Sequence, residues 1–162
     1  MGTLTEKKQK KAISQDAFYK WRSVIALAHL DKKIQPVEKA FIIQKLREVE
    51  KHGITQEQLD ILREDFKTPQ KPIEFLGLIN NPYEMIHALI LGFRLLWCDE
   101  EFHFNEKRSF NYLLKKVASL QKINRFFLED ICKDRSIKTV EDVKKAIKSY
   151  NPMDYHVNSF LS

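Results

Sequence analysis

The chain reads IALAHLDKKIQPVE at residues 25–38 and FRLLWCDEEFHFNE at residues 93–106, and the two stretches follow one pattern. In each, an apolar helical run reaches an Asp, a short link with an apolar residue follows, and a Glu opens the next apolar run. Apolar residues also match outward at the same spacing, in the pairs Phe18/Ile86, Trp21/Leu89, Ile25/Phe93, Ile42/Phe110, Leu46/Leu114 and Val49/Val117. This spacing keeps one face of each flanking helix apolar. The sequence therefore predicts two related helical hairpins in an internal pseudo-twofold repeat.

The composition predicts a single all-α domain. A chain of 162 residues, 43% of them apolar, can build one sizeable core. The four Gly and five Pro are few, and no run alternates with the period of a strand. We expect a compact bundle of seven to eight helices, at about 16–30, 36–52, 56–66, 72–79, 82–98, 104–118, 123–133 and 140–151. Expected N-terminal caps are Ser14, Thr55, Asn81 and Thr139.

Three parts of the chain differ in composition. We expect residues 1–13 to form a disordered basic leader, because Lys7, Lys8, Lys10 and Lys11 cluster there. Residues 14–150 form the helical domain. Residues 151–162 form an aromatic C-terminal tail that packs on the domain or on a partner. The leader could touch a membrane surface peripherally, although a solvated tail is the simpler interpretation.

Cysteine usage and hydropathy favour a cytoplasmic protein. Cys98 and Cys132 lie in apolar helical patterns without metal-type spacing, which is typical of reduced, buried thiols. No secretory signal is evident, and Arg94 interrupts the longest apolar run, so we expect no transmembrane segment. The net charge is +6, but the basic residues are spread over most helices. That spread indicates solvated faces rather than a nucleic-acid site.

The acidic links are the candidate functional site. Asp31 and Asp99 stand at expected helix C-termini, where the macrodipole disfavours a carboxylate by ~0.3–1 kcal/mol. Glu38 and Glu106 stand in the first turn of the next helix, where a carboxylate is favoured. Dense oxygen donors suit Ca²⁺, Mg²⁺ or Mn²⁺. We therefore take these four residues as candidate metal ligands, with His103 as a weaker one; helix capping and solvation are the alternative.

At these residues the chain resembles the TerB-like family, the helical domains of the tellurite-resistance protein TerB and of DjlA-type co-chaperones. The family pattern is an apolar helix ending in Ala-x-x-Asp-Gly, then an apolar residue and a Glu, once in each half. The matching positions are Ala28, Asp31, Ile34 and Glu38 in the first half and Asp99, Phe102 and Glu106 in the second. Lys32 and Glu100 replace the usual Gly after Asp.

The resemblance implies a bundle of about seven helices, acidic residues proposed to bind a divalent metal, and a role in stress response or membrane-associated assemblies. It implies no catalysis. Zinc-hydrolase, nucleophile-elbow and phosphate-loop motifs are absent from the sequence, so we assign no catalytic residue and expect a non-enzymatic module rather than a metal-assisted hydrolase. Two functions stay open: a TerB-like stress-response or scaffold module holding a cation, and a metal-free protein-interaction domain using the aromatic C-terminal region. The protein partner and the oligomeric state are undetermined.

Overall fold

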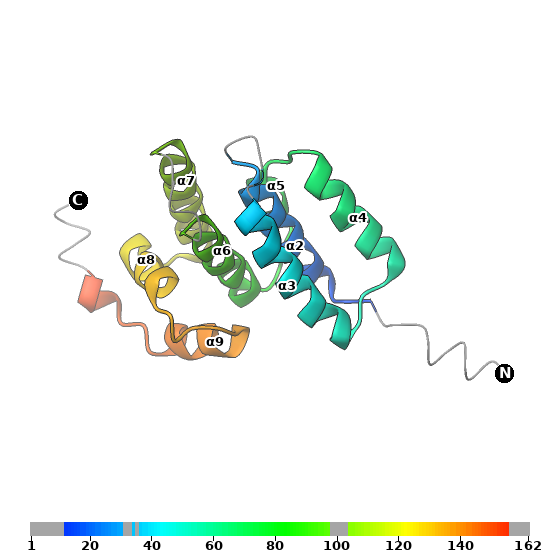
Figure 1. Ribbon diagram of the computed structural model, residues 1–162. Helices are drawn as coiled ribbons and strands as arrows, with labels where there is room; N and C mark the ends of the chain where they lie inside the picture. The colour runs from blue at the N-terminus through cyan, green and yellow to red at the C-terminus, as the bar shows by residue number, and fades with distance from the viewer. Residues whose placement is uncertain (1–11, 31–33, 35, 98–103, 156–162) are drawn as a thin grey trace.

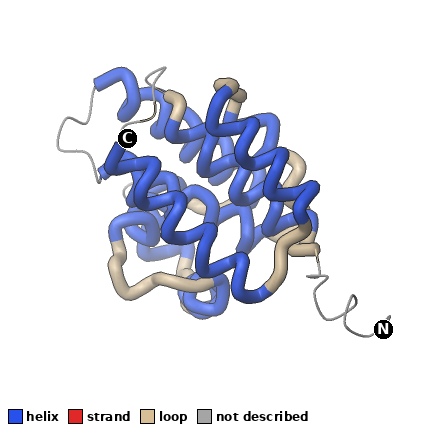
Figure 2. Tube along the Cα trace, turned by 45° about the vertical axis from the view of Figure 1, so that its right-hand side comes forward, coloured by secondary structure: helices blue, strands red, loops and turns tan. Residues whose placement is uncertain are grey.

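The computed structural model describes residues 12–30, 34, 36–97 and 104–155. Within these ranges the chain forms eight α-helices and a short 3₁₀ helix, with no strand, so the all-α prediction is confirmed (Figures 1 and 2). The helices are α2 (Gln15–Ala28), α3 (Pro36–His52), α4 (Gln56–Lys67), α5 (Pro72–Leu76), α6 (Pro82–Trp97), α7 (Phe104–Gln121), α8 (Arg125–Lys133), α9 (Val140–Lys148) and the 3₁₀ helix η1 (Pro152–Tyr155).

Local capping chemistry sets most helix starts where the sequence predicts them. Ser14 Oγ accepts a hydrogen bond from the backbone N–H of Ala17 at 3.1 Å, and Asn81 Oδ1 accepts one from Tyr83 at 2.9 Å. Thr55 and Thr139 each form a full capping box with the residue three positions on. These caps satisfy N–H groups that the first helical turn leaves unpaired.

Four helix C-termini differ from the prediction by two residues or more, and one of them is that of α9, which stops at Lys148 rather than residue 151. Helix α2 stops at Ala28 rather than residue 30, and α5 stops at Leu76 rather than residue 79. Helix α7 runs on to Gln121, beyond the expected residue 118. It ends because Lys122 takes the left-handed conformation at φ 55°, which lets Ile123 N donate to Ala118 O at 3.0 Å. In sequences a glycine usually marks that conformation, so the end of α7 could not be predicted from a lysine at this position.

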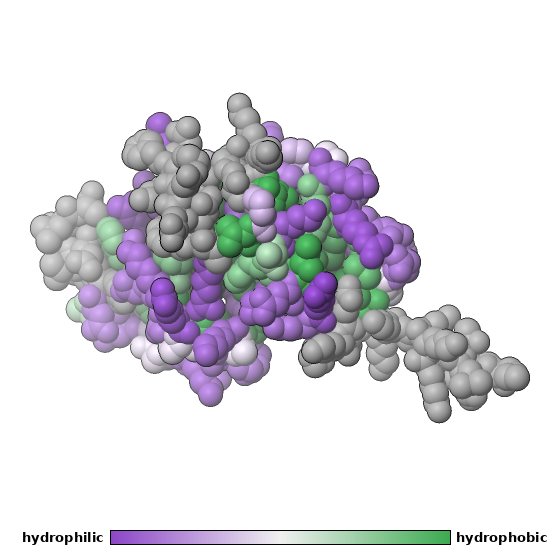
Figure 3. All heavy atoms as spheres, in the orientation of Figure 1, coloured by the Kyte–Doolittle hydropathy of each residue, from purple (hydrophilic) through white to green (hydrophobic). Residues whose placement is uncertain are grey.

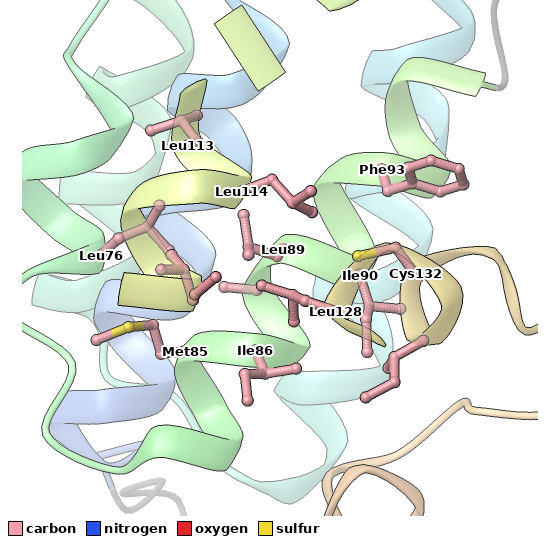
Figure 4. Packing of buried hydrophobic residues seen from close by; sticks show 14 of the residues in the cluster. Leu76, Met85, Ile86, Leu89, Ile90, Phe93, Leu113, Leu114, Leu128 and Cys132 are labelled. Carbon is pink, nitrogen blue, oxygen red and sulfur yellow. The ribbon is translucent and has the colours of Figure 1, made fainter. Parts of the chain in front are cut away.

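The core divides into two clusters that follow the two halves of the chain. One cluster holds Trp21, Ile25, Ile42 and Leu46 with neighbours from α4. The other holds their matched residues Leu89, Phe93, Phe110 and Leu114, packed with α5, α8 and α9. Figure 4 shows labelled side chains from α5, α6, α7 and α8 meeting in the second cluster.

Helices α2 and α6 pack against each other in parallel. The Asp16 carboxylate accepts hydrogen bonds from the backbone N–H groups of Asn80 and Asn81 at 2.9 and 3.0 Å, at the start of both helices. One turn further, Lys20 pairs with Glu84 at 2.8 Å. Near the other end, Leu27 lies against Gly92. Both helices therefore end at the same end of the bundle, with α3 and α4 on the α2 side and α7, α8 and α9 on the α6 side (Figure 1).

Each of these two helices also contributes to the core of the other half. Leu27 of α2 is fully buried in the cluster built mainly from α5–α9. Leu91 and Leu95 of α6 are buried in the cluster built mainly from α2–α4. Apolar side chains therefore cross in both directions, and each half of the chain helps to bury the other.

The C-terminal part of the described chain is only partly packed. The ring of Tyr150 stacks on Phe127, with 4.2 Å between centroids, and Tyr150 Oη accepts a hydrogen bond from Asn124 N at 3.1 Å. Phe127 itself is buried, as its helical pattern predicts. Met153 in η1 is 72% exposed.

The segment before α2 is held against α4. The backbone N–H of Ile13 donates to the side-chain oxygen of Gln58, and the side-chain amide of Gln58 donates to the backbone oxygen of Ile13.

None of the described helices is long and apolar enough to cross a bilayer. Figure 3 shows hydrophilic and hydrophobic side chains next to one another on the face seen in Figure 1.

Candidate functional site

The four candidate metal ligands are only partly described. Asp31 and Asp99, as well as His103, lie outside the described residues. Glu106 is in the third position of α7, but its side chain lies outside the description. Glu38, in the first turn of α3, is 3% exposed. Within the described part of the chain, no three His, Cys, Asp or Glu side chains come together as a metal site would need.

A buried polar cluster joins α2 to α6. Lys20 Nζ lies 2.8 Å from Glu84 Oε2 and 3.1 Å from His87 Nδ1, and Lys20 and His87 are each 8% exposed. An ammonium can only donate, so Nδ1 accepts and the imidazole proton resides on Nε2. Burial lowers the pKa of His87 to about 3, and the Lys20 charge adds to that effect. His87 is thus a neutral acceptor, which differs from a proton-transfer group poised near neutral pH.

A second buried ion pair joins α2 to α4. The Arg22 guanidinium donates to both carboxylate oxygens of Asp65 at 2.7 and 3.0 Å and lies 4.3 Å from the Phe75 ring centroid. The hydrogen bond to Asp65 raises the pKa of Arg22. His29 Nε2 lies 2.9 Å from the backbone oxygen of Asp65. These contacts position α4 and leave the pair no free oxygen for a ligand.

The described cysteine has no nucleophilic character. Cys132 is 1% exposed within the second cluster, and burial raises its pKa to about 12. A thiol of this kind stays protonated and inaccessible at neutral pH. It is the buried, reduced thiol that the sequence predicts, whereas Cys98 lies outside the described residues.

A groove of about 460 Å³ runs between α3 and α4. We call it the hairpin groove, and its lining residues are Lys39, Ile43, Leu46, Arg47, Leu59, Leu62, Arg63, Phe66 and Lys67. Leu46 and Leu62 are buried, whereas Ile43, Leu59 and Phe66 are only partly covered. The lining thus combines an apolar floor with four basic side chains and no carboxylate.

A second cavity, of about 720 Å³, lies where α3 and α6 meet the end of α8 and the turn before α9. We call it the basic cleft, and its lining residues are Phe41, Lys45, Leu91, Phe93, Arg94, Cys132, Lys133, Arg135 and Lys138. A smaller hollow of about 280 Å³ shares Lys45, Leu91 and Lys138 with it and reaches Lys20 and His87.

Neither cavity was predicted from the sequence. Their basic residues come from different helices, and each one fits the solvated face of its own helix. The interruption of an apolar run by Arg94 was the strongest available signal. In the structure this side chain donates from Nη2 to the backbone oxygens of Asp134, at 3.0 Å, and Ile137.

Comparison with known proteins assigns no family to this chain. No protein-family model, curated protein or solved structure matches this chain. The assignment to a function therefore depends on the geometry described above.

Proposed function

We propose that this chain is a non-enzymatic scaffold module that binds an acidic, amphipathic helix of a partner protein in the hairpin groove. The supporting observation is the lining of that groove, where partly covered Ile43, Leu59 and Phe66 lie among Lys39, Arg47, Arg63 and Lys67. A helix seats apolar side chains three and four positions apart in such a groove. Acidic residues flanking that face would meet the basic rim.

Charge complementarity decides the chemistry of the partner. Of the four basic residues, Arg63 lies 3.7 Å from Asp60 in a well-exposed pair, which binds weakly. A basic segment would be repelled by the rim, and a neutral apolar helix would gain nothing from it. The proposal keeps the interaction role expected from the sequence but moves it from the aromatic tail to α3 and α4.

Site-specific cross-linking tests the location. A photoreactive phenylalanine analogue replaces Ile43 in one variant and Leu120 of α7, which is 55% exposed, in the control. We expect position 43 to cross-link an acidic helical segment that position 120 does not reach. A synthetic peptide of that segment should bind the native chain at least about tenfold more tightly than Ile43→Glu. Equal cross-linking from both positions, or capture of basic segments, would contradict the proposal.

A divalent cation at the acidic links is the second candidate, and the parallel packing of α2 and α6 favours it. Asp31 and Asp99 follow these helices in the sequence, so the helix ends that lead to them lie at one end of the bundle. The reciprocal burial of Leu27 and Leu95, which are matched positions, supports the pseudo-twofold repeat on which the TerB-like resemblance depends.

Calorimetry with Ca²⁺, Mg²⁺ and Mn²⁺ tests this candidate on the native chain and on Asp31→Asn combined with Asp99→Asn. Binding to the folded state alone raises the melting temperature. Asp60→Asn is the control, because the Asp60 side chain is 62% exposed on α4. We expect the native chain and the Asp60→Asn control to show heat of binding and a higher melting temperature with the ion. The double variant should show neither. No melting shift with any of the ions would exclude the cation.

A further inference from the structure

The basic cleft concentrates positive charge that the residues lining it do not balance. Five of its nine lining residues are cations, and none is acidic. Lys133 pairs with Glu129 at 2.9 Å. Among the described residues, the other four, Lys45, Arg94, Arg135 and Lys138, form no ion pair. Four cations around one cavity repel one another, and a bound anion would relieve that repulsion.

The acidic side chain in the turn beside the cleft, Asp134, is held by its own loop. Asp134 Oδ1 accepts hydrogen bonds from Ser136 N at 2.9 Å and from Ser136 Oγ at 2.6 Å. These bonds lower the pKa of Asp134 and hold its carboxylate in the local turn. Asp134 therefore stays ionised and offsets part of the positive charge at Arg94, whereas Lys45, Arg135 and Lys138 have no carboxylate paired with them among the described residues.

Two of the cations are positioned in advance. The Arg94 guanidinium is anchored through Nη2 to the carbonyl oxygens of Asp134 and Ile137, and burial lowers its pKa. Lys45 Nζ lies 5.8 Å from the centroid of the Phe41 ring. Side chains held in place lose less conformational entropy when a ligand binds.

Size and lining indicate an organic ligand rather than a bare ion. The volume of about 720 Å³ is in the range of small-molecule sites. Phe41, Leu91, Phe93 and Cys132 supply an apolar part. A phosphate monoester carries about −1.5 to −2 charges, whereas a peptide carries at most −1 per residue at ~3.3–3.6 Å of extended chain. Phosphate groups thus match this charge density better.

We propose that the basic cleft binds a soluble organic polyphosphate, with its phosphates on Lys45, Arg94, Arg135 and Lys138 and its apolar body against Phe41 and Leu91. The site is separate from the hairpin groove, so this inference goes beyond the proposed function. It requires no chemical step.

The test is calorimetry of the full chain with ATP, tripolyphosphate, adenosine and a hexaglutamate peptide, without magnesium and at low salt. We expect ATP to bind most tightly, tripolyphosphate more weakly, and adenosine and hexaglutamate much more weakly. Binding should weaken as salt rises, because phosphate contacts release counterions. Adenosine or hexaglutamate binding as tightly as ATP would overturn the proposal, as would equal binding of tripolyphosphate and ATP.

Matched charge variants locate the site. Lys45→Gln with Lys138→Gln should weaken ATP binding by at least about tenfold, since each removes a charged contact. The control, Lys115→Gln with Lys116→Gln, removes the same charge from an exposed face of α7. A leader variant, with Lys7, Lys8, Lys10 and Lys11 replaced by Gln, separates cleft binding from attraction to that cluster. The proposal fails if the α7 or leader variant loses as much affinity as the cleft variant.

Discussion

Lys20 Nζ lies 3.1 Å from His87 Nδ1, which places a buried ammonium against an imidazole that must stay neutral. The native pKa of about 3 is far below the ordinary 6.5 of histidine. Between these values the unfolded state binds more protons than the native state, so stability falls as pH decreases. Burial and the positive charges of Lys20, Arg94 and Lys45 lower the pKa of His87, whereas its hydrogen bond with the Lys138 backbone acts in the opposite direction.

The first prediction follows for acid stability. From pH 7 to pH 5, His87 alone should remove ~2 kcal/mol of the unfolding free energy. His87→Asn keeps an acceptor for Lys20 and does not titrate, so its unfolding free energy should fall less over the same range. Urea unfolding at both pH values measures the difference. Equal losses in the two chains would contradict the assignment of a neutral His87.

The contact between α2 and α6 gives the second prediction. A Cβ added at Gly92 would lie 2.3 Å from Leu27 Cδ1, and Leu27 is fully buried. Gly92→Ala should therefore destabilise the fold by ~1–3 kcal/mol, although alanine is the better helix former. In a Leu27→Val background the same change should cost less, because the colliding atom is gone. Urea unfolding of the four chains gives this coupling directly.

Gly77→Ala is the control for that pair. Gly77 has φ −66°, and its added Cβ would meet only backbone oxygens, that of Ile73 at 3.3 Å and that of Glu74 at 3.9 Å. We expect its effect to stay within ~1 kcal/mol. A larger loss at Gly77 than at Gly92 would refute the close approach of the two long helices.

The Arg22–Asp65 pair gives the third prediction. Asp65 is 5% exposed and Arg22 21% exposed at the side chain, so Asp65→Ala leaves a mostly buried cation without its partner. We expect a loss of ~2–4 kcal/mol, somewhat below the value for a fully buried pair. Arg22→Met with Asp65→Leu should recover much of it. Glu141→Ala, which breaks a well-exposed pair with Lys144, should cost at most ~1 kcal/mol.

The C-terminal region gives the fourth prediction. Truncation after Tyr150 removes the exposed residues 151–154 and everything beyond, whereas Tyr150→Ala removes the stack on Phe127 and the hydrogen bond from Asn124. We expect truncation to change the melting temperature little. Tyr150→Ala should lower the melting temperature clearly, because it removes ~2–4 kcal/mol of the unfolding free energy. The reverse order would place the structural role in the tail.

The sequence predicted features that depend on neighbours within a few residues. The caps at Ser14, Thr55, Asn81 and Thr139 and the burial of Trp21 and Ile25 follow from local hydrogen bonding and helical period. Pro36 and Gly53 correctly bound α3, and Gly53 has φ 122°. Such features need no knowledge of tertiary contacts.

Features formed between distant segments were not predicted. Arg22 and Asp65 belong to different helices, and the charges of the basic cleft come from α3, α6 and the region around the α8–α9 turn. A lysine on a helix face looks the same in sequence whether it points to water or to another lysine. The acidic links differ again, because Asp31 and Asp99 lie outside the described residues and the metal assignment stays a prediction.

The burial of Cys132 has a practical consequence. Its thiol is 1% exposed in the second cluster, at the wall of the basic cleft, and has a pKa near 12, so an alkylating reagent can react with it only when the packing of α8 loosens. In a chain carrying Cys98→Ser, the rate of alkylation would therefore time the opening of that half of the molecule under native conditions. The reactivity of this one thiol thus reports how often the core around α8 opens in the native protein.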